Sequence, residues 1–107
     1  MAEEILVLIT ASSKDEALKI GTALVDEHLV ACVNIVPEIR SLFFWEGKTR
    51  DEQETLLIGK SRQPLLDQLV ARVKELHSYS VPEVIALPIV GGSADYLQWL
   101  NQATKPV

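Results

Sequence analysis

The sequence has 107 residues and a mass of 11.9 kDa, enough for one domain whose core needs no disulfide or structural metal. Its single cysteine, Cys32, excludes an intrachain disulfide and a zinc site built from several cysteines. The net charge of −5, with scattered basic residues, predicts no nucleic-acid partner, and no apolar run approaches the ~20 residues that span a bilayer, which predicts no membrane partner.

The first expected element is a strand over residues 4–10. Five β-prone apolar residues follow one another there without the gaps of a helical pattern, which predicts burial on both faces of the strand. The chain begins Met1-Ala2-Glu3-Glu4, which is acidic where a secretory signal is basic. We therefore expect a cytoplasmic location.

A helix is expected next, over residues 14–27. Ser13 and Glu16 form the S-x-x-E pattern of a capping box, which marks its start. Its buried face is expected to carry five residues at helical spacing: Ala17, Ile20, Gly21, Leu24 and His28. At the end of the helix, His28 is expected to complement the helix dipole.

A long hairpin is predicted over residues 31–60, with its turn at Trp45-Glu46-Gly47-Lys48. Its first strand would span roughly 50 Å at about 3.3 Å per residue, whereas the preceding helix covers only about 20 Å. Pro37 is expected to mark a break or bulge, because proline donates no ladder hydrogen bond. The overhanging part carries Leu42-Phe43-Phe44-Trp45, which exposes an apolar face however the strand is turned. Another copy of the chain is the simplest cover for it.

The second half of the chain predicts two more helices and one more strand. Pro64 fits the first turn of the second helix, which follows a returning strand over residues 51–60. The buried face of that helix is expected to carry Leu66, Leu69, Val70, Val73 and Leu76. A loop at residues 77–80 precedes a fourth strand over residues 83–90. Ser93 then caps a last helix, which carries Tyr96, Leu97, Trp99 and Leu100.

The order of these elements predicts one α+β domain over residues 1–107. Two right-handed crossovers give a ferredoxin-like sandwich, in which a four-stranded antiparallel sheet carries two helices on one face. The long hairpin joins the second and third strands, and the last helix is an addition at the C-terminus. The other face of the sheet remains uncovered. Together with the overhang, that face predicts a homo-oligomer whose hairpin tips reach into neighbouring subunits.

Few residues suggest catalysis, and we expect the protein not to be an enzyme. Cys32 lies in a strand between Ala31 and Val33, where the ordinary role of a free cysteine is that of a small buried hydrophobe. His77 and Glu83 lie six residues apart and can ligate a divalent ion, although a third ligand must be supplied. The alternative is that His77 stabilises a helix end and Glu83 begins a strand, and the sequence leaves both open.

Four motifs stand in order between about Ile5 and Leu100. They are Ala31-Cys32-Val33-Asn34-Ile35-Val36-Pro37; Ser41 with Trp45-Glu46-Gly47-Lys48; His77-Ser78-Tyr79-Ser80-Val81-Pro82-Glu83 with Ile85-Ala86-Leu87-Pro88-Ile89; and Tyr96-Leu97-Gln98-Trp99-Leu100. Together they resemble the CutA family of divalent-cation tolerance proteins. The resemblance implies a cytoplasmic homotrimer of ferredoxin-like subunits, similar in build to the PII signalling proteins. It also implies an association with copper or other divalent cations and no established enzymatic activity.

Copper ligation in the family is attributed to a Cys that ends the first strand, a His that ends the second helix and the Glu of a Pro-Glu pair. In this sequence Ile9 and Leu76 occupy the first two positions, so only Glu83 matches directly, with His77 beside the His position. Copper favours thiolate or imidazole ligands. The resemblance therefore implies at most weak binding of a divalent cation such as copper, near His77 and Glu83.

Two hypotheses follow. The first is a non-enzymatic homotrimer associated with divalent-cation tolerance or the response to metal ions. The alternative, motivated by the PII-like build, is a sensor or carrier of a small-molecule ligand. That ligand would lie in a cleft between subunits lined by Trp45, Lys48, Lys60, Tyr79 and Trp99. Plain interface packing suits the aromatic residues equally well.

Overall fold

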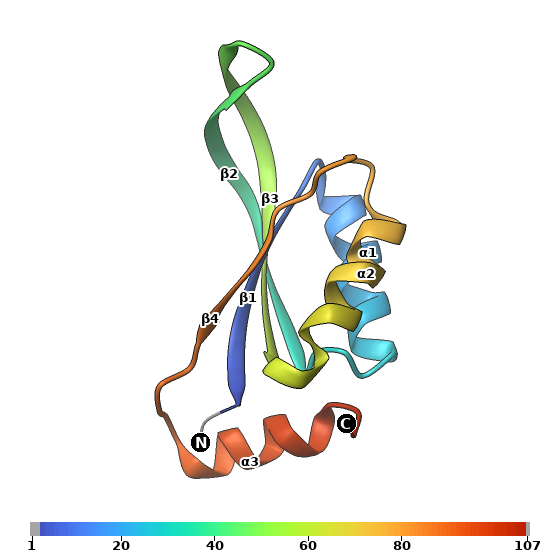
Figure 1. Ribbon diagram of the computed structural model, residues 1–107, viewed down its shortest axis with the longest axis vertical. Coiled ribbons are helices and arrows are strands. Elements are labelled where there is room, and N and C mark those ends of the chain that lie inside the picture. The colour runs from blue at the N-terminus through green and yellow to red at the C-terminus, as the bar shows by residue number, and fades with distance from the viewer. Residues whose placement is uncertain (1–2, 107) are drawn as a thin grey trace.

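The computed structural model describes residues 3–106 and has the predicted ferredoxin-like architecture. Its elements follow the chain as β1 (Glu4–Ala11), α1 (Lys14–Asp26), β2 (Cys32–Trp45), β3 (Lys48–Arg62), a 3₁₀ turn (Gln63–Leu65), α2 (Leu66–Leu76), β4 (Val84–Pro88) and α3 (Ala94–Ala103). The strands form one antiparallel sheet in the order β2-β3-β1-β4. Helices α1 and α2 lie together on one face, and α3 lies across the end of the sheet where β1 begins (Figure 1). Within residues 3–106, every helix is too short or too polar to cross a membrane.

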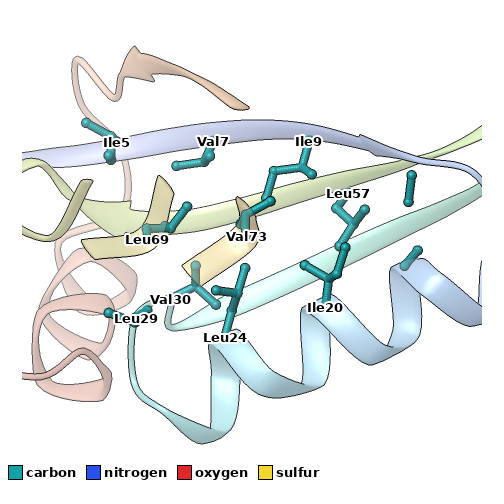
Figure 2. Close-up of a cluster of buried hydrophobic side chains, with 12 residues drawn as sticks. Ile5, Val7, Ile9, Ile20, Leu24, Leu29, Val30, Leu57, Leu69 and Val73 are labelled. Carbon is teal, nitrogen blue, oxygen red and sulfur yellow. The ribbon is translucent and has the colours of Figure 1, made fainter. Parts of the chain in front are cut away.

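The core lies between the sheet and the helices α1 and α2. Val7 and Ile9 of β1 point toward the helices and are fully buried. They belong to one cluster with Ile20 and Leu24 of α1 and Val73 of α2 (Figure 2). The periodicity that predicts both helices is therefore confirmed by the packing of their apolar faces.

The predicted burial of β1 on both faces is wrong for the single chain. Leu6 and Leu8, which point away from the helices, are only half-buried, because none of the described residues 3–106 covers that face. Cross-strand pairing places Ile58 beside Leu8 and Leu87 beside Leu6 on the same face. We call this surface the bare face; its apolar residues are Leu6, Leu8, Val36, Leu56, Ile58, Ile85 and Leu87.

Helix α1 begins where the sequence predicts, but its cap differs from a capping box. The Ser13 hydroxyl accepts a hydrogen bond from the Glu16 backbone N–H at 3.1 Å, as expected. The Glu16 carboxylate reaches back one residue further, to the backbone N–H and hydroxyl of Ser12. His28 does not lie on the buried face. It is exposed with φ of 59°, because the chain has already left the helix in a left-handed turn.

The hairpin of β2 and β3 projects beyond the helical layer, as its length predicts (Figure 1). Its two-residue turn has positive φ at Glu46 (50°) and Gly47 (82°), the type I′ geometry that matches strand twist. The pairing register shifts between Val36 and Ile39, so the bulge expected at Pro37 is present. Strand β3 starts at Lys48 rather than 51, since this tight turn lets pairing begin at once.

Strand β4 is shorter than the predicted 83–90. Its ladder with β1 runs from Val84, opposite Ile9, to Pro88, opposite Ile5. Pairing ends there because β1 itself begins at Glu4. Just beyond the ladder, the Ile89 N–H still donates to the Glu4 carbonyl. Ser93 caps α3 by accepting from the Tyr96 N–H, as expected.

Candidate functional site

His77 ends α2 and ties that helix to β1. Its side chain is fully buried, and its Nε2 lies 2.7 Å from the Thr10 carbonyl oxygen. Its Nδ1 lies 3.0 Å from the backbone nitrogen of Tyr79. A carbonyl only accepts and a backbone N–H only donates, so the tautomer with its proton on Nε2 satisfies both contacts. Both nitrogens therefore hold the fold together.

Tyr79 extends the hydrogen-bond network of His77 to β3. Its hydroxyl donates to Glu54 Oε2 at 2.8 Å, and its ring packs against that of His77, with centroids 4.6 Å apart. Glu54 is buried although it is acidic. Burial, followed by the neighbouring Glu54 carboxylate, raises the pKa of Tyr79 well above its usual value, so the phenol remains a donor.

Glu16 of α1 binds the loop that follows α2. Burial alone would raise the pKa of this carboxyl, but hydrogen bonds from Ser12 and Ser78 outweigh it and lower the pKa from 4.5 to about 2. The Ser78 backbone N–H donates to Glu16 Oε2 at 2.8 Å. The carboxylate thus holds the loop after α2 against the start of α1.

A second group of polar side chains lies where β2 begins, on the bare face. Lys60 of β3 is the direct cross-strand partner of Cys32, and its Nζ donates to Asn34 Oδ1 and lies 3.9 Å from Cys32 Sγ. Burial first, and then Cys32, raise the pKa of Tyr96 on α3. The Tyr96 ring packs on that of Trp99, with centroids 5.4 Å apart.

The expectation that Cys32 is a small buried hydrophobe is wrong. The residue is only partly buried, and its thiol faces the Lys60 ammonium and the Asn34 amide. The physical reason is the strand register. Val33 packs against the core, so Cys32 must point to the opposite face.

The five residues predicted to line a cleft lie in separate places within one chain. Trp45 and Lys48 flank the turn of the hairpin. Tyr79 lies beside Glu54 in the loop after α2. Lys60 lies beside Cys32 near the end of β3, and Trp99 packs on Tyr96 within α3. Figure 1 shows the hairpin tip and α3 at opposite ends of the molecule, whose longest dimension is 44 Å. One chain therefore does not gather the five residues, and the inter-subunit cleft stays a prediction.

The two predicted metal ligands differ in accessibility. Glu83 is exposed just before β4, but a cation would have to displace either Thr10 or Tyr79 from the ring of His77. Residues 3–106 contain no group of three or more His, Cys, Asp or Glu side chains placed to hold a metal ion. The described side chains of one chain therefore do not form a site that fits a resident metal ion.

Sequence reasoning missed the polar partners that complete these groups. They are Glu16, Asn34 and Glu54. One signal was available for Glu54, which stands at the alternating position of a strand that continues with Leu56 and Ile58. A charged residue at such a position has to find a partner when the strand is buried.

The family model described as CutA1 divalent ion tolerance protein matches residues 5–103. The "Divalent-cation tolerance protein CutA" of Thermus thermophilus is 48% identical over 101 residues, which cover 94% of this chain and 98% of that protein. The chain belongs to the CutA family. Another CutA relative, "Protein CutA 1, chloroplastic" of Oryza sativa, is 48% identical over 94% of this chain. The match spans only 57% of that rice protein's length.

Solved CutA structures have the same fold as this chain. The crystal structure of CutA1 from Oryza sativa superposes with a TM-score of 0.96 at 46% identity, covering 99% of this chain and 97% of that chain. The Thermus thermophilus CutA1 structure gives a TM-score of 0.93 at 47% identity, with coverage of 95% and 99%. An Archaeoglobus fulgidus CutA structure is described as periplasmic. Because CutA relatives carry chloroplastic and periplasmic names, the cytoplasmic location of this chain stays a prediction.

Proposed function

We propose that this chain acts as a non-enzymatic homotrimer in tolerance of divalent cations. The observation that carries the proposal is the family match over residues 5–103. Relatives from Thermus thermophilus and Pectobacterium atrosepticum are named divalent-cation tolerance proteins, at 48% and 34% identity. The chain spans about 57% of the length of the rice relative. Any role of that longer protein is therefore also only a proposal for this chain.

Two exposed apolar surfaces support the homotrimer. On the bare face, Ile85 and Leu87 are 52% and 45% exposed, beside the half-buried Leu6 and Leu8. At the hairpin tip Phe44 is 74% exposed. A soluble monomer rarely exposes a contiguous apolar surface of this kind, and copies of one chain can cover it through a closed symmetric assembly.

The environment of Cys32 supports a role other than catalysis. Nucleophilic catalysis needs a thiol next to a general base, but Cys32 faces the Lys60 ammonium and Asn34. The side chain of His77 is fully buried, and both of its ring nitrogens form hydrogen bonds to backbone groups. Proton transfer by this ring would require the fold to open.

Growth in copper tests the tolerance role. A copper-sensitive host that expresses the chain should withstand a higher Cu²⁺ concentration than the same host with an empty vector. A variant that cannot assemble, Ile58→Asp on the bare face, should lose this protection at an equal level of soluble protein. Equal growth with and without the wild-type chain would contradict the proposed role.

Titration calorimetry with Cu²⁺ and Zn²⁺ tests the ligand assignment separately. We expect weak binding that Glu83→Ala reduces, whereas Glu38→Ala, which changes another exposed glutamate, leaves it unchanged. The double variant His77→Ala, Glu83→Ala should abolish binding if its circular dichroism shows a retained fold. Identical isotherms for the wild type and the double variant would remove the proposed ligands.

A further inference from the structure

Helix α3 is joined to the rest of the domain by a short, exposed link. The hydrogen bonds of the described residues stop at Ile89, whose N–H donates to the Glu4 carbonyl, and resume at Ser93, which caps α3. Between them Val90 is 94% exposed, and a Cβ added to Gly91 would have no atom within 4 Å. The link can therefore change its backbone angles without losing a described contact, as the residues of a hinge do.

Helix α3 also has few apolar contacts of its own. Of its ten residues only Leu100 is fully buried, and Tyr96 and Trp99 are more than 40% exposed. Figure 1 shows that the helix lies across the end of the sheet, outside the layer of α1 and α2. A helix of this length is only marginally stable alone, because most helical stability comes from packing of an apolar face. The order of α3 must therefore depend on what holds it to the sheet.

The C-terminal end of α3 is held by side chains from other elements. Arg62, the last residue of β3, donates from Nε to the Thr104 hydroxyl at 2.8 Å and from Nη2 to the Lys105 carbonyl at 2.6 Å. The Nδ1 atom of His28 lies 3.3 Å from the Ala103 carbonyl oxygen. The last turn of α3 contains no basic residue, so Arg62 supplies the positive charge that stabilises the end of a helix.

Arg62 depends on these contacts as much as α3 does. Only 13% of its side chain is exposed, and the Glu3 carboxylate lies 3.9 Å from Nη1, too far for a good hydrogen bond. Its close partners among the described residues are thus Thr104 and Lys105. Hydrogen bonds from a charged donor stabilise more than those between neutral groups. The guanidinium and the end of α3 therefore satisfy each other only while the helix is docked.

We propose that α3 opens and closes as one unit about the link 90–92, and that Arg62 is the latch that keeps it closed. The rest of the domain stays folded when α3 opens, because the core cluster between the sheet and helices α1 and α2 does not include Leu100. Opening exposes Leu100 and the end of the sheet that α3 covers. The latch does not depend on the metal-tolerance role.

Hydrogen exchange of the intact protein, followed by mass spectrometry of its peptides, tests the hinge. In the wild type, the amides of residues 97–103 should exchange faster than those of β1, because a local opening costs less free energy than global unfolding. Equal protection of α3 and β1 would overturn the proposal, since α3 would then open only when the whole domain unfolds.

Three variants test the latch. Arg62→Met removes the donors at nearly equal length and should accelerate exchange of residues 97–103 roughly tenfold or more. Arg72→Met, which breaks the ion pair between α2 and Glu27, should leave exchange in α3 unchanged. Thr104→Val removes one acceptor of Arg62 at nearly equal volume and should accelerate exchange in α3 several-fold. This variant keeps the test decisive if Arg62→Met does not fold.

A thiol at the buried position of α3 measures the opening directly. Leu100→Cys is made together with Cys32→Ala, so that the new thiol is the only one in the chain. It should react with a disulfide reagent under native conditions faster than the protein unfolds, and Arg62→Met should raise the rate further. A rate equal to that of global unfolding, or unchanged by Arg62→Met, would overturn the latch.

Sedimentation of Arg62→Met separates the latch from assembly. The variant should keep the oligomer mass of the wild type, because the core and the bare face are unchanged. A lower mass, with exchange accelerated equally in β1 and α3, would show that the change acts on the whole assembly and would overturn the latch. Growth in copper is a separate readout, so failure of the tolerance role is distinguishable from failure of the latch.

Discussion

At the scale of single residues, the most constrained polar groups of the chain cannot be identified from the sequence pattern. His77 and Glu83 attract attention because their side chains ligate metals, yet both nitrogens of His77 bond to the backbone of residues 10 and 79. Glu54 has no distinguishing motif, and its partner Tyr79 lies 25 positions along the chain. Hydrogen bonds of this separation depend on the fold and cannot be found from local pattern.

Tyr79→Phe removes the hydroxyl that donates to the buried Glu54 carboxylate. We expect the free energy of unfolding to fall by about 1.5–3 kcal/mol, as is typical for a hydrogen bond to a charged group. Denaturant unfolding of Tyr79→Phe, Glu54→Gln and the double variant measures the coupling between the two side chains. A loss below about 0.5 kcal/mol for Tyr79→Phe would show that the contact does not matter for stability.

Glu16 should make stability depend on acidity. Its pKa is about 2 in the folded chain against 4.5 as the reference value, so its contribution is complete above about pH 4.5 and disappears as the pH falls toward 2. With allowance for solvent screening, that contribution is about 2 kcal/mol. In denaturant unfolding at neutral pH, the free energy of unfolding of the wild type should be higher than that of Glu16→Gln. This difference in free energy should shrink between pH 4.5 and 2. A difference that is independent of pH would contradict the expectation.

At the scale of elements, alternation and capping signals predict where most helices and strands lie, but not every boundary. The first residue of β3 depends on the turn geometry, and the end of β4 depends on where β1 begins. The sequence also does not show that Glu16 reaches Ser12 rather than Ser13, since both are serines one residue apart. Such details follow from contacts between elements.

The hairpin turn offers an element-scale prediction. Glu46 has φ of 50°, which a residue with a large side chain adopts at a cost and which asparagine tolerates better. Glu46→Asn should therefore stabilise the protein by about 0.5 kcal/mol, because the exposed ion pair it loses with Arg50 contributes little. Thermal and denaturant unfolding measure the change.

Gly47→Ala is the matched control in the same turn. An added Cβ would have no atom within 4 Å, so its cost comes only from φ of 82° and should be about 1 kcal/mol. A destabilised Glu46→Asn, or a neutral Gly47→Ala, would show that the turn is not held in the type I′ conformation.

At the scale of the whole molecule, the sequence predicts the ferredoxin-like order and an uncovered sheet face, and the structure has both. What it does not predict is which residues meet at the rim of that face. Arg62, the last residue of β3, donates to the Thr104 hydroxyl at 2.8 Å only because α3 lies across the end of the sheet, 42 positions further along the chain. Placement of a terminal helix is a property of packing and has no signature in local periodicity.

Sedimentation equilibrium at micromolar concentration tests most directly whether copies of this chain cover the bare face. The wild type should have a mass of about three times 11.9 kDa. Ile58→Asp, which places a charge in the centre of the face, should sediment at a lower mass, whereas the exposed change Lys74→Met should not alter it. A wild-type mass of 11.9 kDa would contradict a shared sheet face.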